Sequence, residues 1–134
     1  DFLNKLNGMF AFILYDKAKG TYFVARDHIG IIPLYVGFDD KGTLYISSEM
    51  KGLMDYCTTV EEFPPGHYMM GTHDFVQWYK PEWAEKIPTK KLALPELRKA
   101  LEKSVKGEMM SDVPYGVLIS GGLDSSLIAA IASK

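Results

Sequence analysis

The feature that most constrains this chain is a short segment, Ser120-Gly-Gly-Leu-Asp-Ser-Ser126, that lies between two apolar stretches. The stretch before it, 115–119, predicts a buried strand, and the stretch after it, 127–131, predicts a helix that begins at Ser125 or Ser126. Two adjacent glycines permit positive φ values and let backbone N–H groups gather around an anion. The sequence therefore predicts a strand–turn–helix unit whose loop binds a phosphate group at the positive end of the helix.

The acidic residue of this segment indicates that a metal ion accompanies the phosphate. The carboxylate of Asp124 would repel a phosphate unless a divalent cation lies between them. The loop is not a Walker A sequence, because Asp124 and not lysine follows Leu123, so the P-loop kinase and GTPase classes are excluded. The structural alternative is a plain glycine turn in which Ser125 only caps the helix.

Composition and charge narrow the function classes further. The 134-residue chain is 47% hydrophobic and 24% charged, which is typical of a globular protein. Its net charge of −2 disfavours nucleic acids and anionic membranes as partners, and no apolar run is long enough to span a bilayer. The one cysteine, Cys57, excludes an internal disulfide framework and indicates a reducing, cytoplasmic compartment.

Apolar and aromatic segments separated by turn residues predict antiparallel β structure in the first part of the chain. Two segments flank a charged loop closed by Gly20, and the next two flank Asp39-Asp-Lys-Gly42, which indicates two hairpins. A third pair follows Pro64-Pro-Gly66, and a short helix is expected over 49–54. The expected strands are 8–15, which is apolar enough to be fully buried, 21–25, 34–38, 43–47, 67–70 and 75–79.

A change of composition near Lys80 predicts a domain boundary. Prolines 81 and 88 interrupt a stretch rich in lysine and glutamate, so we expect a linker over 81–92. The chain is thus expected to be an α+β protein, with an antiparallel β domain over 1–80 and an α/β unit over 93–134. Because both ends run directly into expected elements, we also expect an internal segment of a longer protein.

The α/β unit is expected to open with an amphipathic helix. Pro95 suits the first turn of a helix, and Glu96 complements the positive end of the helix dipole. Leu97, Leu101 and Val105 recur at helical spacing, which is most simply explained by packing against a sheet or a domain interface.

Two sets of residues resemble known families. Ser-Gly-Gly-x-Asp-Ser at 120–125 resembles the PP-loop of ATP pyrophosphatases, which cleave ATP between the α and β phosphates. The segment Arg26–Tyr35 is similar to the R-D-x-x-G-x-x-P-L segment of class II glutamine amidotransferases, and residues 8–12, 48–51 and 63–67 also resemble that class. For this segment alone, an ion pair of Arg26 and Asp27 at a strand end is the alternative.

The order of these segments resembles the glutamine-hydrolysing asparagine synthetase family over nearly the whole chain. The resemblance implies the C-terminal part of an N-terminal-nucleophile glutaminase domain over 1–80, followed by the start of an α/β PP-loop ATP pyrophosphatase domain over 93–134. It also implies a ligase that activates the side-chain carboxylate of aspartate with Mg-ATP as a β-aspartyl-adenylate. Ammonia from glutamine then displaces AMP, giving asparagine, AMP, pyrophosphate and glutamate as products.

The same resemblance assigns roles residue by residue. Asp124 is expected to hold Mg²⁺. The resemblance implies aspartate, glutamine and ATP as small-molecule partners, with no nucleic acid and no membrane, and it leaves a homodimer open. ATP and its pyrophosphate portion are expected to bind at Ile119, Ser120, Gly121, Gly122, Asp124, Ser125 and Ser126.

The sequence also departs from the family pattern. The family's glutaminase nucleophile is an N-terminal cysteine, whereas Cys57 is internal, so no catalytic residue is expected in this segment. Glu108 stands where the family usually places a basic residue, which puts a charge-based role there in question. Two alternatives stay open: an enzyme of the β-lactam synthetase type, and an inactive truncated fragment with only a structural role. The isolated chain is expected to be inactive.

Overall fold

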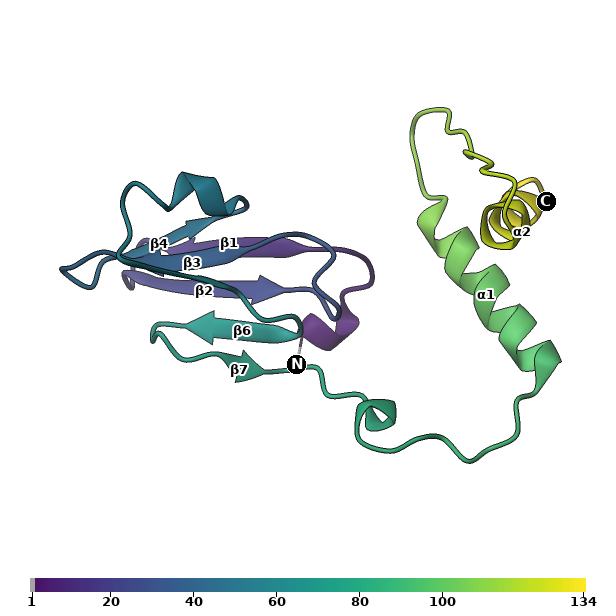
Figure 1. The fold of residues 1–134 in the computed structure, drawn as a ribbon, viewed down its shortest axis with the longest axis horizontal. Helices are drawn as coiled ribbons and strands as arrows, with labels where there is room; N and C mark the ends of the chain where they lie inside the picture. The colour runs from purple at the N-terminus through teal and green to yellow at the C-terminus, as the bar shows by residue number, and fades with distance from the viewer. Residues whose placement is uncertain (1) are drawn as a thin grey trace. The chain divides into compact units, whose positions relative to one another are not determined.

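The computed structural model describes residues 2–134, which form two compact units. The first unit ends at Ile87, and the second spans Pro88–Lys134. All the strands belong to the first unit and both α-helices belong to the second (Figure 1). The division after Ile87 falls within residues 81–92, which were expected to form a linker. The assignment of each unit to a domain type stays a prediction.

One sheet of the first unit has four antiparallel strands in the order β1-β2-β6-β7. The hairpin of β1 and β2 pairs Ala11 with Arg26 at one end and Asp16 with Thr21 at the other. The next pairing joins β2 to β6, with Val24 opposite Met69. The strands are β1 (Ala11–Asp16), β2 (Thr21–Arg26), β6 (His67–Met70) and β7 (Val76–Gln77).

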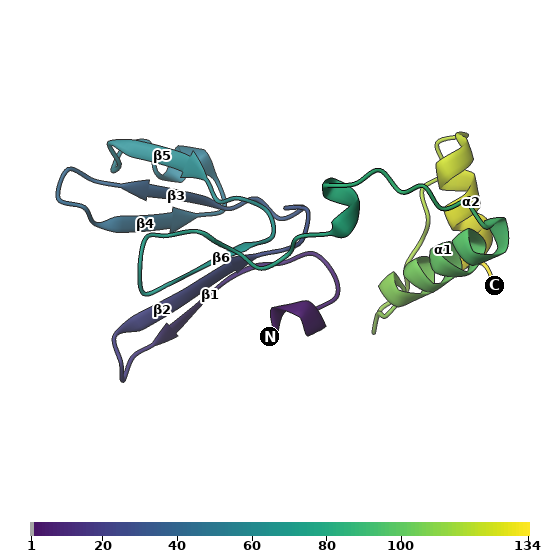
Figure 2. The same ribbon diagram turned by 90° about the horizontal axis from the view of Figure 1, so that it is seen from below.

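The other sheet has three antiparallel strands in the order β4-β3-β5. Its central strand is β3 (Tyr35–Phe38), which pairs with β4 (Leu44–Ser47) and with β5 (Thr59–Glu62). Figure 2 shows the two sheets as separate layers of the first unit. Three short 3-10 turns complete the irregular segments: η1 (Leu3–Lys5), η2 (Met50–Gly52) and η3 (Glu82–Ala84).

The hydrophobic core of the first unit lies between its two sheets. Val24 of β2 and Met69 of β6 contribute from one sheet, and Val36 of β3 contributes from the other. Leu34 and Phe63, which flank strands β3 and β5, complete the buried cluster. A fully buried apolar side chain stabilises a fold by about 1.5–3 kcal/mol. This cluster therefore holds the two sheets together and fixes the positions of the loops at their ends.

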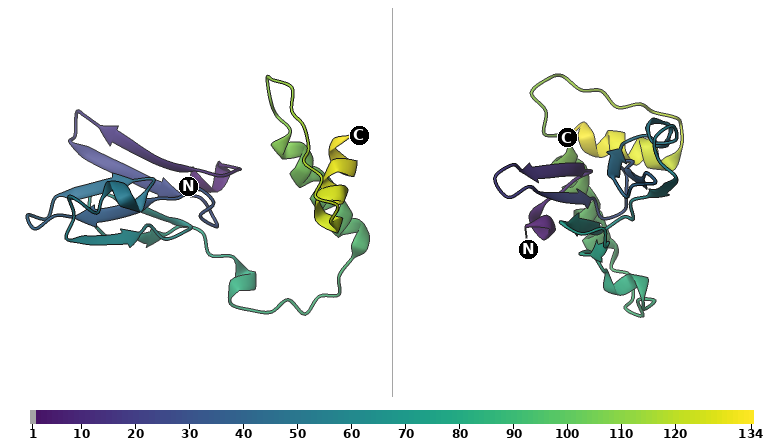
Figure 3. Two further views of the ribbon diagram at one scale, coloured as in Figure 1. Left: turned by 45° about the horizontal axis from the view of Figure 1, so that its top comes forward. Right: turned by 90° about the vertical axis from the view of Figure 1, so that its left-hand side faces the viewer.

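The second unit consists of two helices and the segment that connects them (Figure 3). Helix α1 (Leu94–Glu108) begins after Ala93, with proline in its first turn and Glu96 beside it. Helix α2 (Leu123–Ala132) packs against α1 and contains Ile131, the buried residue of this helix pair. The apolar stripe of α1 thus packs against α2. From the sequence we expected it to pack against a sheet or a domain interface.

Most of the expected elements are confirmed. The two hairpins and the third strand pair are present in the first unit, and the helix after the boundary is present in the second, in an α+β arrangement with antiparallel sheets. The short helix expected over 49–54 is present as the 3-10 helix η2, which spans only Met50–Gly52. Strand β5 was not expected, because Thr59-Val-Glu-Glu62 contains a single apolar residue and becomes a strand only by pairing with β3.

Two expected strands differ from the structure. Residues 115–119, expected to form a buried strand, are not in a strand, and Leu118 is 94% exposed. The second unit, all of which the structure describes, contains no strand to pair with this segment, and backbone groups without a partner strand cannot form a ladder. The strand expected over 8–15 begins only at Ala11, and it is not fully buried because β1 lies at the edge of its sheet and exposes Leu14 and Tyr15.

Neither α-helix in the described part of the chain is both long and apolar enough to cross a membrane.

Candidate functional site

The glycine loop leads directly into helix α2, as the sequence indicates, but the helix starts earlier than expected. Gly122 is the N-cap residue in an extended conformation, and the N–H of Ser126 donates a hydrogen bond to its carbonyl at 3.2 Å. Helix α2 therefore begins at Leu123, and the expectation of a start at Ser125 or Ser126 is wrong. Ser125 is not the cap, and no side chain caps this helix end. The first N–H groups of α2 are thus open to an external acceptor.

The two glycines of the loop serve different purposes. Gly121 has a φ of +84°, which L side chains rarely adopt, whereas Gly122 has an ordinary φ of −80°. A Cβ atom added at Gly121 would meet no atom within 4 Å, and one added at Gly122 would lie 3.5 Å from Ser120 Oγ. The backbone conformation, and not crowding, requires glycine at 121. The space above both residues is open, so a ligand can approach the backbone closely.

Hydrogen bonds within the loop bring Ser120 and Ser125 together. The N–H of Ser120 donates to Ser125 Oγ at 3.2 Å, and the two hydroxyl oxygens are 3.0 Å apart. Ser125 also donates to the carbonyl of Gly122 at 3.3 Å, and Ser126 Oγ donates to the same carbonyl at 2.7 Å. The three serines expected at the site are therefore linked to one another through the backbone of residues 120–122. Ser125 is half-buried, and Ser120 and Ser126 are exposed.

The other expected site residues lie at the rim of this loop. Asp124 is exposed in the first turn of α2, and among the described residues it forms no ion pair. Ile119 precedes the loop and is 64% exposed. Residues 2–134 contain no group of three His, Cys, Asp or Glu side chains that could hold a metal ion. One carboxylate beside a phosphate site nevertheless suits Mg²⁺, which proteins commonly bind through one or two carboxylates together with substrate phosphates.

A second loop, which follows β2, is organised by a buried carboxylate. Asp27 is 1% exposed, and its two oxygens accept hydrogen bonds from five backbone N–H groups. The shortest, from Gly30, is 2.7 Å, and the donor most distant along the chain is Phe10, at 3.3 Å. The donors are the backbone nitrogens of Phe10, Ile29, Gly30, Ile31 and Ile32.

The guanidinium of Arg26 binds the carbonyl groups of this loop, whereas Asp27 binds its N–H groups. Arg26 is 4% exposed, and its Nε donates to the carbonyl of Ile32 at 2.8 Å, while Nη2 donates to the carbonyl of Gly30 at 2.8 Å. Its Nη1 donates to the carbonyl of Phe63 and forms an ion pair with Glu62 Oε1 at 2.7 Å. The suggested ion pair between Arg26 and Asp27 is absent from the described residues. Arg26 instead joins the loop to the end of β5.

The hydrogen bonds around Asp27 also determine its charge state. Burial raises the pKa of the Asp27 carboxyl, but the N–H groups of Ile31, Ile32, Gly30 and Ile29 lower it by more. The net effect is a pKa below the usual range for aspartate, so the carboxylate is ionised at neutral pH. An ionised carboxylate with five N–H donors is a satisfied buried anion, and its role here is to hold the loop.

Sequence reasoning missed the partners of this loop. Glu62 lies 36 residues from Arg26, and Phe10 lies 17 residues before Asp27. No local pattern connects residues at such distances, so only the pairing of the strands reveals them. The one available signal was the Arg26-Asp27 dipeptide itself, since adjacent opposite charges at the end of an apolar strand require partners.

The single cysteine is not placed for catalysis. Cys57 is half-buried, and its Sγ would lie only 2.6 Å from a Cβ atom added to Gly37 of β3. Burial, with a smaller contribution from the charge of Asp39, raises the pKa of the Cys57 thiol above its usual value. A protonated thiol is a poor nucleophile at neutral pH. The residue packs against β3, where a side chain at position 37 would clash with it.

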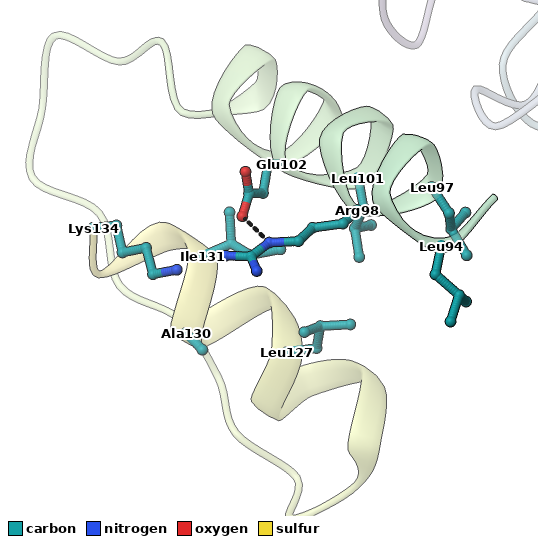
Figure 4. A pocket seen from close by; sticks show the side chains of 9 residues that line it. All are labelled: Leu94, Leu97, Arg98, Leu101, Glu102, Leu127, Ala130, Ile131 and Lys134. Carbon is teal, nitrogen blue, oxygen red and sulfur yellow. Dashed lines mark hydrogen bonds and ion pairs between the residues drawn. The ribbon is translucent and has the colours of Figure 1, made fainter.

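Helices α1 and α2 line an open pocket of about 390 Å³ within the second unit (Figure 4). Its one polar interaction joins Arg98 Nε to Glu102 Oε1 at 2.9 Å, drawn as a dashed line. Six of the nine lining residues are aliphatic, and the other three, Arg98, Glu102 and Lys134, are charged. The lining residues are Leu94, Leu97, Arg98, Leu101, Glu102, Leu127, Ala130, Ile131 and Lys134.

Comparison with known proteins matches both units. The family model described as a glutamine amidotransferase domain matches residues 1–77, and the model described as asparagine synthase matches residues 96–134. The chain is 52% identical over 137 residues to asparagine synthetase B [glutamine-hydrolyzing] of Escherichia coli (strain K12). It is 46% identical over 141 residues to a probable asparagine synthetase [glutamine-hydrolyzing] of Dictyostelium discoideum. Each alignment covers 100% of this chain and 25% of the relative, so the chain spans about a quarter of the length of these relatives.

Proposed function

Because the chain belongs to the family of glutamine amidotransferase domains, we propose that it is part of a glutamine-hydrolysing asparagine synthetase. In this proposal the first unit belongs to an N-terminal-nucleophile glutaminase domain, and the second unit belongs to a PP-loop ATP pyrophosphatase domain. The whole protein would convert aspartate to asparagine through a β-aspartyl-adenylate, with ammonia supplied by glutamine. The observation that carries the proposal is the open glycine loop at the start of α2, within the segment that matches asparagine synthase.

The loop suits the pyrophosphate portion of ATP. The uncapped N–H groups at the start of α2 point their positive dipoles toward an anion, and the open space above Gly121 and Gly122 admits phosphate oxygens. Asp124, in the first turn, is the residue that would hold Mg²⁺. Bound Mg²⁺ would neutralise charge that develops on the departing pyrophosphate. Ile119, which is exposed just before the loop, would contact the nucleotide.

The first unit contributes a scaffold in this proposal. The Asp27 carboxylate and the Arg26 guanidinium hold the loop after β2 in one conformation through hydrogen bonds to its backbone. The raised pKa of Cys57 argues against its acting as the glutaminase nucleophile, so this role is assigned to no residue of the described segment. A cytoplasmic location and a homodimer both stay predictions.

The test uses the protein at its natural length, with asparagine, pyrophosphate and glutamate each measured. Asp124→Asn preserves size and hydrogen-bonding shape but removes the metal-binding charge. We expect it to reduce asparagine and pyrophosphate formation at least tenfold while glutamate formation from glutamine continues. Asp112→Asn, an exposed aspartate in the segment between the helices, is the matched control and should change none of the three products. Unchanged pyrophosphate formation in Asp124→Asn would contradict the assignment of the loop.

A further inference from the structure

We propose that Trp78 is a positioning residue for the transfer of ammonia from glutamine to the aspartyl adenylate, because it fixes the point at which the chain leaves the first unit. This inference rests on the proposed function. Trp78 comes directly after residues 1–77, which match the glutamine amidotransferase domain. It begins the connection, residues 78–93, which leads from the end of β7 to the start of α1.

Backbone hydrogen bonds fasten the start of the connection to the loop that follows β2. The carbonyl of Gly66 accepts the N–H of Trp78 at 2.9 Å and the N–H of Tyr79 at 3.2 Å. The N–H of Gly66 in turn donates to the carbonyl of Asp27 at 2.8 Å. Gly66 has a φ of +65°, and a Cβ atom added there would lie 3.2 Å from the Cβ of Tyr79. One glycine thus joins the connection to the loop that contains the buried carboxylate.

The side chain of Trp78 adds contacts that the backbone does not supply. Its Nε1–H donates to the carbonyl of Arg26 at 3.3 Å. Its ring stacks on the ring of Phe10 at 6.1 Å between centroids, and it meets the ring of His28 edge to face at 4.7 Å. His28 also meets the ring of Tyr79 edge to face, at 4.6 Å. These four rings are all half-buried, and aromatic pairs of this kind add to the stabilisation that burial provides.

The groups that Trp78 contacts belong to a well-packed part of the first unit. Arg26 and Asp27 are 4% and 1% exposed, and their hydrogen bonds hold the loop after β2. Phe10 is bound to the same carboxylate, to which its N–H donates at 3.3 Å. The other tryptophan of the chain, Trp83, lies in η3 of the connection and is 63% exposed. Of the two tryptophans, Trp78 is the one placed to hold the connection on the first unit.

A fixed exit point matters for a reaction that uses ammonia from a second site. A connection that starts from a fixed point can adopt fewer conformations than one whose first residues are released. Ammonia that escapes into water is protonated to ammonium, which is not a nucleophile. Release of the exit point should therefore waste glutamine, because glutamate still forms while less asparagine forms for each glutamate.

Product ratios in the protein at its natural length test this inference. Trp78→Ala should lower the asparagine formed per glutamate about three- to tenfold, since small misplacements far from the chemistry have effects of at least this size. Glutamate formation from glutamine should match the wild type. Asparagine formation from ammonium chloride, which bypasses the transfer, should match it as well. Equal losses in all three measurements would show that Trp78 only stabilises the fold, and would overturn the inference.

Two further variants separate the contacts of Trp78 from a general effect of changing the connection. Trp78→Phe keeps a ring that can stack on Phe10 and loses the Nε1–H, so it should restore most of the product ratio. Trp83→Ala is the matched control and should leave the ratio unchanged. A normal ratio in Trp78→Ala would overturn the role of Trp78 and leave the proposed function intact. Absence of asparagine formation by the wild type would overturn both.

Discussion

The loop after β2 and the loop before α2 both present backbone N–H groups around one point, but only the first supplies its own anion. In the first, the carboxylate of Asp27 accepts five backbone N–H groups, four of them from consecutive residues 29–32. In the second, no side chain accepts from the start of the helix. The aspartate there, Asp124, is exposed. A loop that contains its own anion is part of the scaffold, and a loop that lacks one is suited to bind an anion from solution.

Asp27 is buried and Asp124 is exposed, so changes in the two loops should affect the free energy of unfolding differently. Removing the buried carboxylate at 27 leaves several N–H groups without partners, and each such group costs about 1–3 kcal/mol. Changes in the exposed loop leave groups that water can satisfy. The first loop should therefore control stability and the second should control ligand binding.

The largest expected effect comes from Asp27→Ala. Five donors lose their acceptor, but water can reach those of the exposed residues Ile29 and Ile31, so the free energy of unfolding should fall by about 3–5 kcal/mol. Urea denaturation followed by tryptophan fluorescence is suitable, since Trp78 Nε1 donates to the carbonyl of Arg26 at 3.3 Å. Asp124→Ala is the matched control in the other loop and should change stability by no more than about 0.5 kcal/mol. Equal losses in the two variants would contradict the comparison.

The next effect comes from Arg26→Lys. Lysine keeps the charge but lacks the planar fork that reaches the carbonyls of Ile32, Gly30 and Phe63 together, so the free energy of unfolding should fall by about 2–4 kcal/mol. Glu62→Gln, which alters only the half-exposed partner of the ion pair, should cost less than about 1 kcal/mol. If Glu62→Gln proves as costly as Arg26→Lys, the ion pair and not the carbonyl contacts holds the loop.

A smaller effect concerns acid stability. The pKa of Asp27 is lower in the folded protein than in the unfolded chain. Ionisation of this carboxyl therefore stabilises the fold fully when the pH is above the ordinary aspartate pKa of about 4. That contribution is lost as the pH falls below about 4 through the folded-state pKa. Urea titrations between pH 2 and about 6 should show the wild type losing stability faster than Asp27→Asn as the pH falls. Parallel pH profiles would show that the carboxylate is not held as an anion.

The smallest effect distinguishes glycines in the second unit. Gly121→Ala places a side chain at a φ of +84°, so it should lower the stability of the unit by about 1 kcal/mol. Gly107 lies in α1 without a positive φ or a neighbour within 4 Å, and Gly107→Ala should raise stability by about 0.5–1 kcal/mol. Thermal unfolding followed by circular dichroism at 222 nm measures both. Two changes of the same sign would show that the loop does not keep its left-handed turn.

Much of the first unit could be predicted from local patterns. The hairpins around Gly20 and Gly42 follow from turn residues between apolar segments, and both glycines have positive φ values. Strand β5 could not be predicted in this way, because only its pairing with β3 makes it a strand. The strand expected over 115–119 does not form, because an apolar pattern makes a strand only when a partner strand pairs with it.

The sequence by itself determined which residues could form a phosphate-binding loop, because the glycine pair and the serines of 120–126 are a local pattern. It also determined the family resemblance. Only the tertiary structure decided that Asp27 is a buried anion, that Arg26 pairs with Glu62, and that Ser125 lies against Ser120. The physical reason is the separation along the sequence of the residues that interact. Turn conformation depends on a few neighbouring residues, whereas a buried charge is satisfied by groups that the fold brings together from distant parts of the chain.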